Sequence, residues 1–173
     1  IDMTLRAVLR PGDEVLIPEP CFVCYAPLAT LMGATPVPVE TKAEDGFRLT
    51  AKGLREAITK RTRALIFPFP SNPTGAVMRR EHLEEIAAVL RDTDILVITD
   101  EVYGELTYGE KPHESIADFR CGNRQCGTRG CIIAVGSAAP ILDSLGSLSS
   151  ESTTAVAADQ PISHGVFSAD TFL

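Results

Sequence analysis

The sequence predicts an α/β domain in which a mostly parallel sheet carries helices on both faces, as a three-layer sandwich. Segments of strand character alternate along the chain with helical segments of about ten residues, an order typical of parallel sheets. The strand segments are continuous apolar runs, and strands of that kind are buried on both faces. In such sheets ligands bind at the carboxyl ends of the strands.

The elements follow one another in a regular order. The apolar patterns predict helices over residues 1–9, 22–32, 50–58 and 81–90. They predict strands over residues 14–18, 35–40, 64–67, 95–99 and 131–135. Prolines make residues 35–40 an edge or peripheral strand, because proline lacks the N–H that a central strand uses.

Local signals support two of these helices. Thr50 is placed to cap the helix that follows it, and Leu49 and Leu54 have the spacing of a hydrophobic staple. In the helix at 81–90 the apolar residues fall on one face, which is the pattern of an amphipathic helix. That face consists of Leu83, Ile86, Ala87 and Leu90.

Composition and charge exclude several classes of protein. The chain has 173 residues, 45% of them hydrophobic, which suits one globular domain with a real core. Its net charge of −7 argues against a nucleic-acid partner, and its densest basic stretch, residues 60–63, is most simply a solvated loop before a strand. No apolar run reaches the roughly 18 residues of a membrane span, and no secretory signal is visible, so we expect a cytoplasmic protein without a membrane partner. Because the chain opens on Ile1 inside a helical pattern, we interpret it as a fragment.

The cysteines do not form a recognisable metal or redox motif. Cys21 and Cys24 are a close pair, but a zinc site usually needs two such pairs, and no second one is present. A redox role would need a thioredoxin-like context, which their neighbours do not supply. The remaining cysteines are Cys121, Cys126 and Cys131. We therefore expect reduced cysteines and no metal.

Two short segments place polar side chains where strands end. Residues 71–75 read Ser-Asn-Pro-Thr-Gly and follow the strand at 64–67 after a short loop. Residues 100–103 read Asp-Glu-Val-Tyr and follow the strand at 95–99 directly. Both segments are therefore expected at the same edge of the sheet, where ligands bind.

We expect Asn72, Asp100 and Tyr103 to converge at this edge. Asp100 and Tyr103 are three residues apart, so they share a face if a helical turn starts there. Taken alone, each has a simpler interpretation: Asp100 as a helix cap, Asn72 as a turn residue and Tyr103 as half-buried packing. The spacing favours the joint interpretation, because an amide, a carboxylate and a phenol together can hold a pyridine-type cofactor.

Through these two segments, the chain resembles the class I/II aminotransferases, which are fold-type I pyridoxal-phosphate-dependent enzymes. The resemblance also includes residues 9–18 and much of residues 47–64, and it covers about residues 1–119. It implies part of the large domain of that family, with its mostly parallel central sheet incomplete. Residues 120–173 show weak or no resemblance and are interpreted as an aberrant tail.

The resemblance implies a role for each residue of the candidate site. Asp100 would pair with the pyridine nitrogen of pyridoxal 5′-phosphate and keep it protonated, because a nearby anion raises the pKa of that nitrogen. Asn72 and Tyr103 would hydrogen-bond the phenolic oxygen of the ring. Phe22 matches the aromatic position that stacks on the ring face. Its alternative interpretation is a core phenylalanine at a helix start.

The departures from the family are equally specific. The lysine that bonds covalently to the cofactor would fall near Ala139, and the chain contains no lysine after Lys111. No catalytic residue is therefore assigned, and we expect cofactor binding to be weak or lost. The glycine-rich phosphate loop and the small domain that binds the substrate carboxylate are not found either. The loss of pattern after residue 119 is interpreted as a shift of reading frame or as real divergence.

The resulting functional expectation is an aminotransferase-like, pyridoxal-phosphate-binding fragment that is inactive alone. In the family an amino acid and a 2-oxo acid are the substrates, and the enzymes are usually homodimers. The alternatives are a non-catalytic remnant that binds no cofactor, and a relative that acts as a lyase or decarboxylase. The polar set around the ring does not separate transamination from those reactions.

Overall fold

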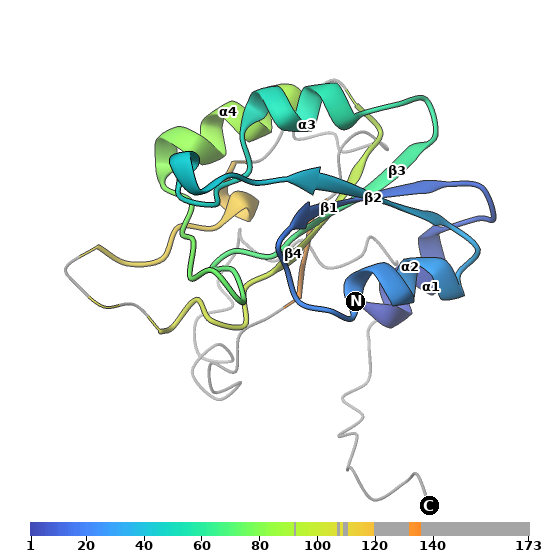
Figure 1. Cartoon of the computed structure of the whole chain (residues 1–173), viewed down its shortest axis with the longest axis horizontal. Helices are drawn as coiled ribbons and strands as arrows, with labels where there is room; N and C mark the ends of the chain where they lie inside the picture. Colours follow the sequence, from blue (N-terminus) through green and yellow to red (C-terminus); the bar gives the residue numbers. More distant parts are fainter. Residues whose placement is uncertain (92, 107, 109–110, 120–131, 136–173) are drawn as a thin grey trace, which may run out of the picture.

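The described part of the chain contains five strands, which form one parallel sheet in the order β2-β1-β3-β4-β5 (Figure 1). This computed structural model describes residues 1–91, 93–106, 108, 111–119 and 132–135. The strands are β1 (Glu14–Glu19), β2 (Thr35–Glu40), β3 (Thr62–Phe67), β4 (Leu96–Asp100) and β5 (Ile132–Val135). The further strand expected near residues 131–135 is thus confirmed, and it pairs in parallel with β4.

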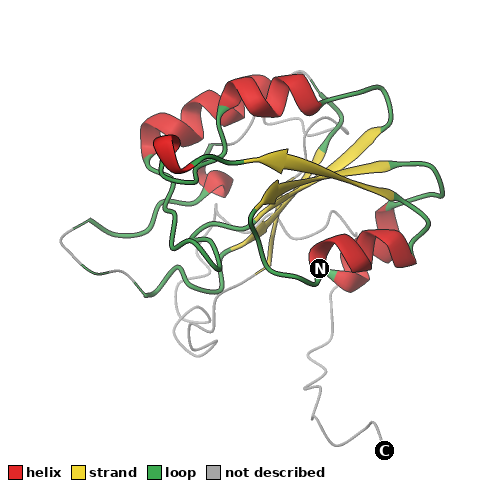
Figure 2. Ribbon diagram, viewed as in Figure 1, coloured by secondary structure: helices red, strands yellow, loops and turns green. Residues whose placement is uncertain are grey.

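Helices cover both faces of this sheet, so the three-layer α/β prediction is confirmed (Figure 2). Helices α1 (Asp2–Val8) and α2 (Tyr25–Leu31) lie on one face, and α3 (Ala51–Ala57) and α4 (Arg80–Leu90) lie on the other. Two short 3-10 helices, η1 (Ala43–Asp45) and η2 (Ile116–Asp118), lie in loops. No helix in the described ranges is long and apolar enough to cross a membrane.

The central strands β1, β3 and β4 are apolar on both sides because each side packs into a separate core. Alternate residues of a strand point to opposite faces of its sheet. Leu16 and Leu65 therefore pack with α3 and α4, whereas Ile17 and Ile66 pack with α1 and α2. All four are at most 1% exposed, and burying a side chain of this size contributes roughly 1.5–3 kcal/mol.

The local signals read from the sequence are present. The Thr50 hydroxyl accepts a 3.1 Å hydrogen bond from the Gly53 N–H and caps α3. Leu49 and Leu54 are both buried, as their staple spacing predicts. The apolar face of α4 packs on the sheet through Leu83, Ile86 and Leu90, with Ala87 partly buried beside them.

Strand β2 is an edge of the sheet, and its prolines suit that position. The N–H groups of Thr35 and Thr41 donate to carbonyls on the β1 side. The N–H positions alternate sides along a strand, so Pro36 and Pro38 fall where the N–H would face away from β1. The open edge of β2 consequently has few donors for another strand.

One expectation from the sequence needs correction, and one alternative interpretation is excluded. Helix α2 begins at Tyr25, three residues after the predicted start, because residues 22–24 form the turn in which the chain leaves β1. No helix begins at Asp100 either: Asp100 is the last residue of β4, and residues 102–105 form a turn. Asp100 therefore does not act as a helix cap in this structure.

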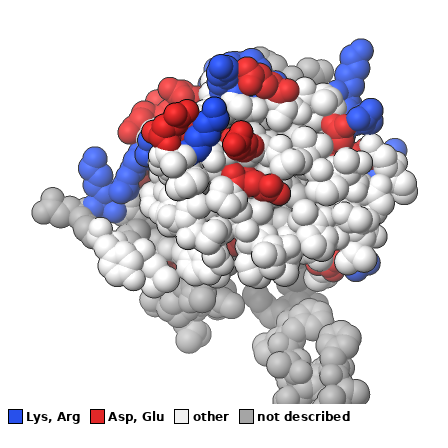
Figure 3. Space-filling model, in the orientation of Figure 1, with Lys and Arg blue, Asp and Glu red and all other residues white. Residues whose placement is uncertain are grey.

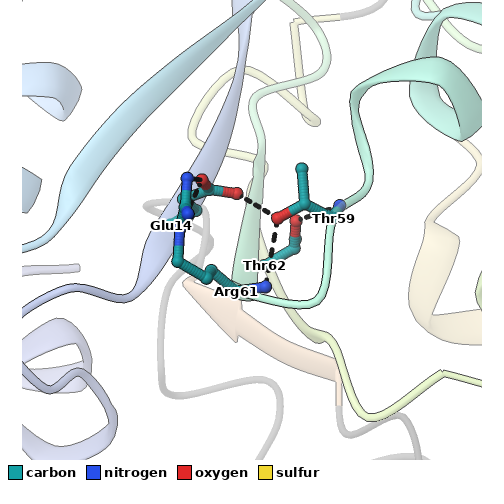
Figure 4. Close-up of polar contacts among 4 residues, drawn as sticks. All are labelled: Glu14, Thr59, Arg61 and Thr62. Atoms are coloured by element: carbon teal, nitrogen blue, oxygen red, sulfur yellow. Dashed lines mark hydrogen bonds and ion pairs between the residues drawn. The ribbon is translucent and has the colours of Figure 1, made fainter.

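The loop before β3 is fastened to the start of β1 (Figure 4). Glu14 is 3% exposed, and its carboxylate accepts hydrogen bonds from the Thr59 hydroxyl and the Arg61 guanidinium, the latter with an Nε–Oε1 distance of 2.9 Å. The hydrogen bond from Thr59, opposed by burial and assisted by Arg61, lowers the pKa of Glu14. The stretch at 60–63 was expected as a solvated loop before a strand, but only its first two residues precede β3, which begins at Thr62, and Arg61 bonds the buried Glu14.

Candidate active site at the carboxyl ends of the strands

The sheet has a switch point between β1 and β3. The chain leaves β1 through α2 to reach β2 on one side, whereas it leaves β3 through α4 to reach β4 on the other side. The loops therefore diverge at the carboxyl ends of β1 and β3, which is where doubly wound sheets bind ligands. A cavity of about 300 Å³ lies at this position, at the lower end of the volumes typical of small-molecule sites. It is lined by Phe22, Tyr25, Pro68, Pro70, Asn72, Asp100, Val102 and Tyr103.

The loop after β3 presents Asn72 through a closed hydrogen-bonded turn. The Gly75 N–H donates to the Ser71 carbonyl at 2.8 Å, and the Ser71 N–H donates to the Ala76 carbonyl at 2.9 Å. This path needs a residue with positive φ, and Gly75 adopts φ 68° at no steric penalty. Asn72 is left half-buried at the cavity wall, where its amide can meet a ligand.

Asp100 projects from the end of β4 toward α2. The Tyr25 hydroxyl donates a 2.8 Å hydrogen bond to Asp100 Oδ2, although the two residues are 75 positions apart. The Val102 N–H makes a long contact of 3.4 Å with the other carboxylate oxygen. Tyr25 is 5% exposed, and its burial, followed by the bond to Asp100, raises the pKa of its hydroxyl. Tyr25 therefore stays a neutral donor that orients the carboxylate.

Aromatic side chains form the mouth of the cavity. Phe22 is 44% exposed and packs edge-to-face on Tyr25, with ring centroids 5.8 Å apart. Tyr103 is 37% exposed on the opposite loop, beside Val102, which is 45% exposed. Because Phe22 is not buried in a core, its ring face can meet a flat ligand. Charged side chains gather instead over the α3 and α4 side of the molecule (Figure 3).

The four residues singled out from the sequence line the same cavity. Phe22, Asn72, Asp100 and Tyr103 come from the carboxyl ends of three strands and the loops that follow them, and the structure places all four on the cavity wall. Their role toward a cofactor stays a prediction. Ala139, where the lysine was expected, lies outside the described residues, as does the tail at 120–173 apart from β5.

Sequence reasoning missed Tyr25. It stands three residues after Phe22, a spacing that indicates a shared surface only if the segment is helical. Its contact with Asp100 depends on how α2 lies over the sheet, which no local pattern encodes.

The thiols near the cavity are free. Cys21 and Cys24 form no disulfide. Burial, with a smaller effect from the charge of Glu19, raises the pKa of Cys21 to about 11. Such a thiol is a poor nucleophile. Among the described residues, no three His, Cys, Asp or Glu side chains are grouped so as to hold a metal ion.

A doubly wound α/β sheet with a polar and aromatic cavity at its switch point defines a class of ligand-binding and enzyme domains. Within it, the family model for aminotransferase class I and II matches residues 1–139. The chain therefore belongs to the class I and II aminotransferase family. The match extends beyond residue 119, the limit expected from the sequence, and so includes β5.

Known relatives agree with this assignment. A putative aminotransferase of Bacillus subtilis (strain 168) is 48% identical over 111 residues, which cover 64% of this chain and 29% of that protein. The aspartate aminotransferase of Pyrococcus abyssi is 48% identical over 117 residues, which cover 68% of this chain and 30% of that protein. The chain thus spans about 30% of the length of the curated relatives it matches.

Solved structures have the same fold. An aromatic aminotransferase from Pyrococcus horikoshii OT3 superposes with a TM-score of 0.66 and 44% identity, covering 77% of this chain and 35% of that one. An aspartate aminotransferase from Thermus thermophilus superposes with a TM-score of 0.67 and 34% identity, covering 77% and 33%. These neighbours support the fold class predicted from the sequence.

Proposed function

We propose that the cavity binds the pyridine ring of pyridoxal 5′-phosphate and forms one wall of an aminotransferase active site. The observation that carries this proposal is Asp100, a carboxylate oriented by Tyr25 at the wall of a cavity of about 300 Å³. An oriented anion beside a cavity suits a cationic ring nitrogen, because it favours the protonated form of that nitrogen.

The remaining lining residues fit the same ring. The amide of Asn72 and the hydroxyl of Tyr103 can donate hydrogen bonds to a phenolic oxygen. The exposed face of Phe22 can stack on the ring and exclude water from one side. When bound, pyridoxal phosphate supplies an electron sink for amino-acid chemistry, and these residues would bind and orient it.

We further propose that this chain does not catalyse amino-group transfer between an amino acid and a 2-oxo acid on its own. None of the residues that line the cavity is a lysine, and the sequence has no lysine after Lys111. A lysine would serve as both nucleophile and proton carrier. Without it the activation barrier should rise by several kcal/mol, which slows the reaction by on the order of three to six powers of ten.

The test is a titration with the amine form of the cofactor, which needs no lysine for binding. We expect saturable binding with a dissociation constant on the order of 0.1–1 mM, because a few hydrogen bonds and one charged contact carry it. A matched probe with C–H in place of the ring nitrogen should bind at least about tenfold more weakly. Equal binding of both probes would show that Asp100 does not hold the ring nitrogen. Binding of neither probe would favour a remnant without cofactor binding.

A further inference from the structure

Asp100 and Glu101 are adjacent acids whose side chains serve opposite faces of the sheet. Asp100 points to the α2 side, where Tyr25 holds it. Glu101 does not line the cavity, and its carboxylate accepts a hydrogen bond from the Thr99 hydroxyl. Thr99 and the core residue Val97 are two positions apart in β4, so both point to the α3 and α4 side of the sheet. Asp100 therefore lies on the cavity wall, whereas the side chain of Glu101 lies on the opposite face of the sheet.

Both carboxylate oxygens of Glu101 are engaged in hydrogen bonds. The hydroxyls of Thr99 and Ser115 donate to Oε1 at 2.8 and 2.6 Å, and His113 Nε2 lies 2.8 Å from Oε2. The side chains of Glu101 and His113 are only 14% and 18% exposed. Burial by itself would raise the pKa of Glu101, but the hydrogen bonds from His113, Ser115 and Thr99 outweigh it and lower that pKa. We call these four residues the Glu101 cluster.

His113 also supports the turn that carries Tyr103. The Gly104 N–H donates to the Glu101 carbonyl at 2.8 Å, and the Leu106 N–H donates to the Tyr103 carbonyl at 2.9 Å. A Cβ on Gly104 would lie 3.1 Å from Cδ2 of the His113 ring, so this glycine allows the turn and the ring to touch. The position of the turn thus depends on where the ring lies.

The residues after His113 are anchored elsewhere in the fold. Ser115 Oγ accepts the Ala117 N–H at 3.0 Å and caps η2, and Ile116 is 1% exposed in the core with α4. The Glu114 carboxylate accepts the Arg80 N–H at the start of α4 at 2.9 Å. His113 and Ser115 therefore transmit the position of a fixed segment to Glu101.

We propose that the Glu101 cluster positions the cavity wall formed by Asp100, Val102 and Tyr103, so that ring binding depends on His113 and Ser115 although neither lines the cavity. This inference rests on the proposed function for its binding readout. Glu101 and His113 are positioning residues here, since they act through the turn at 101–106.

The test compares two substitutions of His113 in the full chain. His113→Leu keeps most of the ring's volume but removes the donor to Glu101, whereas His113→Gln keeps an N–H donor. We expect His113→Leu to weaken binding of the cofactor's amine form by about tenfold and His113→Gln to remain within about threefold of wild type. Glu105→Gln, an exposed acid in the same turn, is the matched control and should bind as wild type.

Amide hydrogen exchange at Gly104 and Leu106 gives a readout that needs no ligand. We expect His113→Leu to accelerate exchange at both amides by about tenfold, with partial recovery in His113→Gln. If His113→Leu does not fold, Ser115→Ala replaces it with the same expected direction. Unchanged exchange, a Gln variant no better than Leu, or faster exchange without weaker binding would overturn the proposal. If the wild type binds no amine form, the proposed function fails, and exchange alone then decides whether the cluster sets the turn.

Discussion

Acids stand at both ends of the sheet, Glu14 buried and Asp100 half-buried, and they differ in how many hydrogen bonds their carboxylate oxygens accept. At the amino ends, Glu14 accepts hydrogen bonds from Thr59 and Arg61 (Figure 4). Glu14 does not line the cavity. At the carboxyl ends, Asp100 has one short bond, from Tyr25, and lies on the cavity wall. A carboxylate whose two oxygens both accept hydrogen bonds from neighbouring loops holds those loops together. A carboxylate that is oriented by one hydrogen bond and faces a cavity is available to a ligand.

The largest effect is expected from removing the charge at the carboxyl end. Asp100→Asn keeps an acceptor for the Tyr25 hydroxyl but loses the anion, so the free energy of unfolding should change by less than about 0.5 kcal/mol. Binding of the cofactor's amine form should weaken by roughly ten- to 150-fold, the equivalent of about 1.5–3 kcal/mol for a charged hydrogen bond. Ligand-detected NMR titration measures this, with the exposed Asp118→Asn as the control. A loss of binding of the same size in Asp118→Asn would show that the effect is not specific to Asp100.

Removing the charge at the amino ends of the strands should lower the stability of the fold and leave ring binding nearly unchanged. In Glu14→Gln the hydrogen bonds to Thr59 and Arg61 lose their ionic character, so the free energy of unfolding should fall by about 1.5–3 kcal/mol. Ring binding, measured well below the melting temperature, should stay within about twofold of wild type, because Glu14 lies at the far end of the sheet. Urea unfolding gives the first quantity. A stable Glu14→Gln variant with weakened binding would contradict the division of roles.

The free energy of unfolding should fall in acid because of Glu14 and Glu101, whose carboxylates are held by hydrogen bonds. The pKa values of Glu14 and Glu101 are lowered in the fold, so the unfolded chain binds more protons in acid. Their contribution is therefore complete above the ordinary glutamate pKa near 4.5 and is lost as the pH falls toward the lowered values. Urea unfolding between pH 6 and pH 3 should show a steep decline in wild type and a shallower one in Glu14→Gln and in Glu101→Gln. Parallel curves for wild type and both variants would exclude these two carboxylates as the cause.

The smallest effect is expected from Tyr25→Phe. This change removes the donor to Asp100 Oδ2 and leaves the packing against Phe22 in place. One hydrogen bond of this kind contributes about 0.5–1.5 kcal/mol, so binding of the amine form should weaken by about two- to tenfold. The same titration measures it, and unchanged binding would show that Asp100 is positioned without Tyr25.

Much of the fold was predictable because its determinants are local. Apolar runs locate β1, β3, β4 and β5 within two residues, and the alternating prolines at 35–40 locate the edge strand β2. The runs at β1, β3 and β4 are continuous because strands covered on both faces need apolar residues throughout. Thr50 and the apolar face of α4 likewise act within one or two turns of helix. The start of α2 and the turn after Asp100 were not predicted, because they depend on how the chain crosses the edge of the sheet.

The family, the order of strands and helices, and the polar segments at 71–75 and 100–103 can be read from the sequence alone, as can the lack of a lysine after Lys111. Which distant side chains meet is visible only in three dimensions: Tyr25 with Asp100 across 75 residues, Glu14 with Arg61 across 47, and Glu101 with His113 across 12. The difference arises because helices and strands form from contacts within a few residues of one another. The pairing of side chains follows instead from the strand order and from the loops that cross the ends of the sheet.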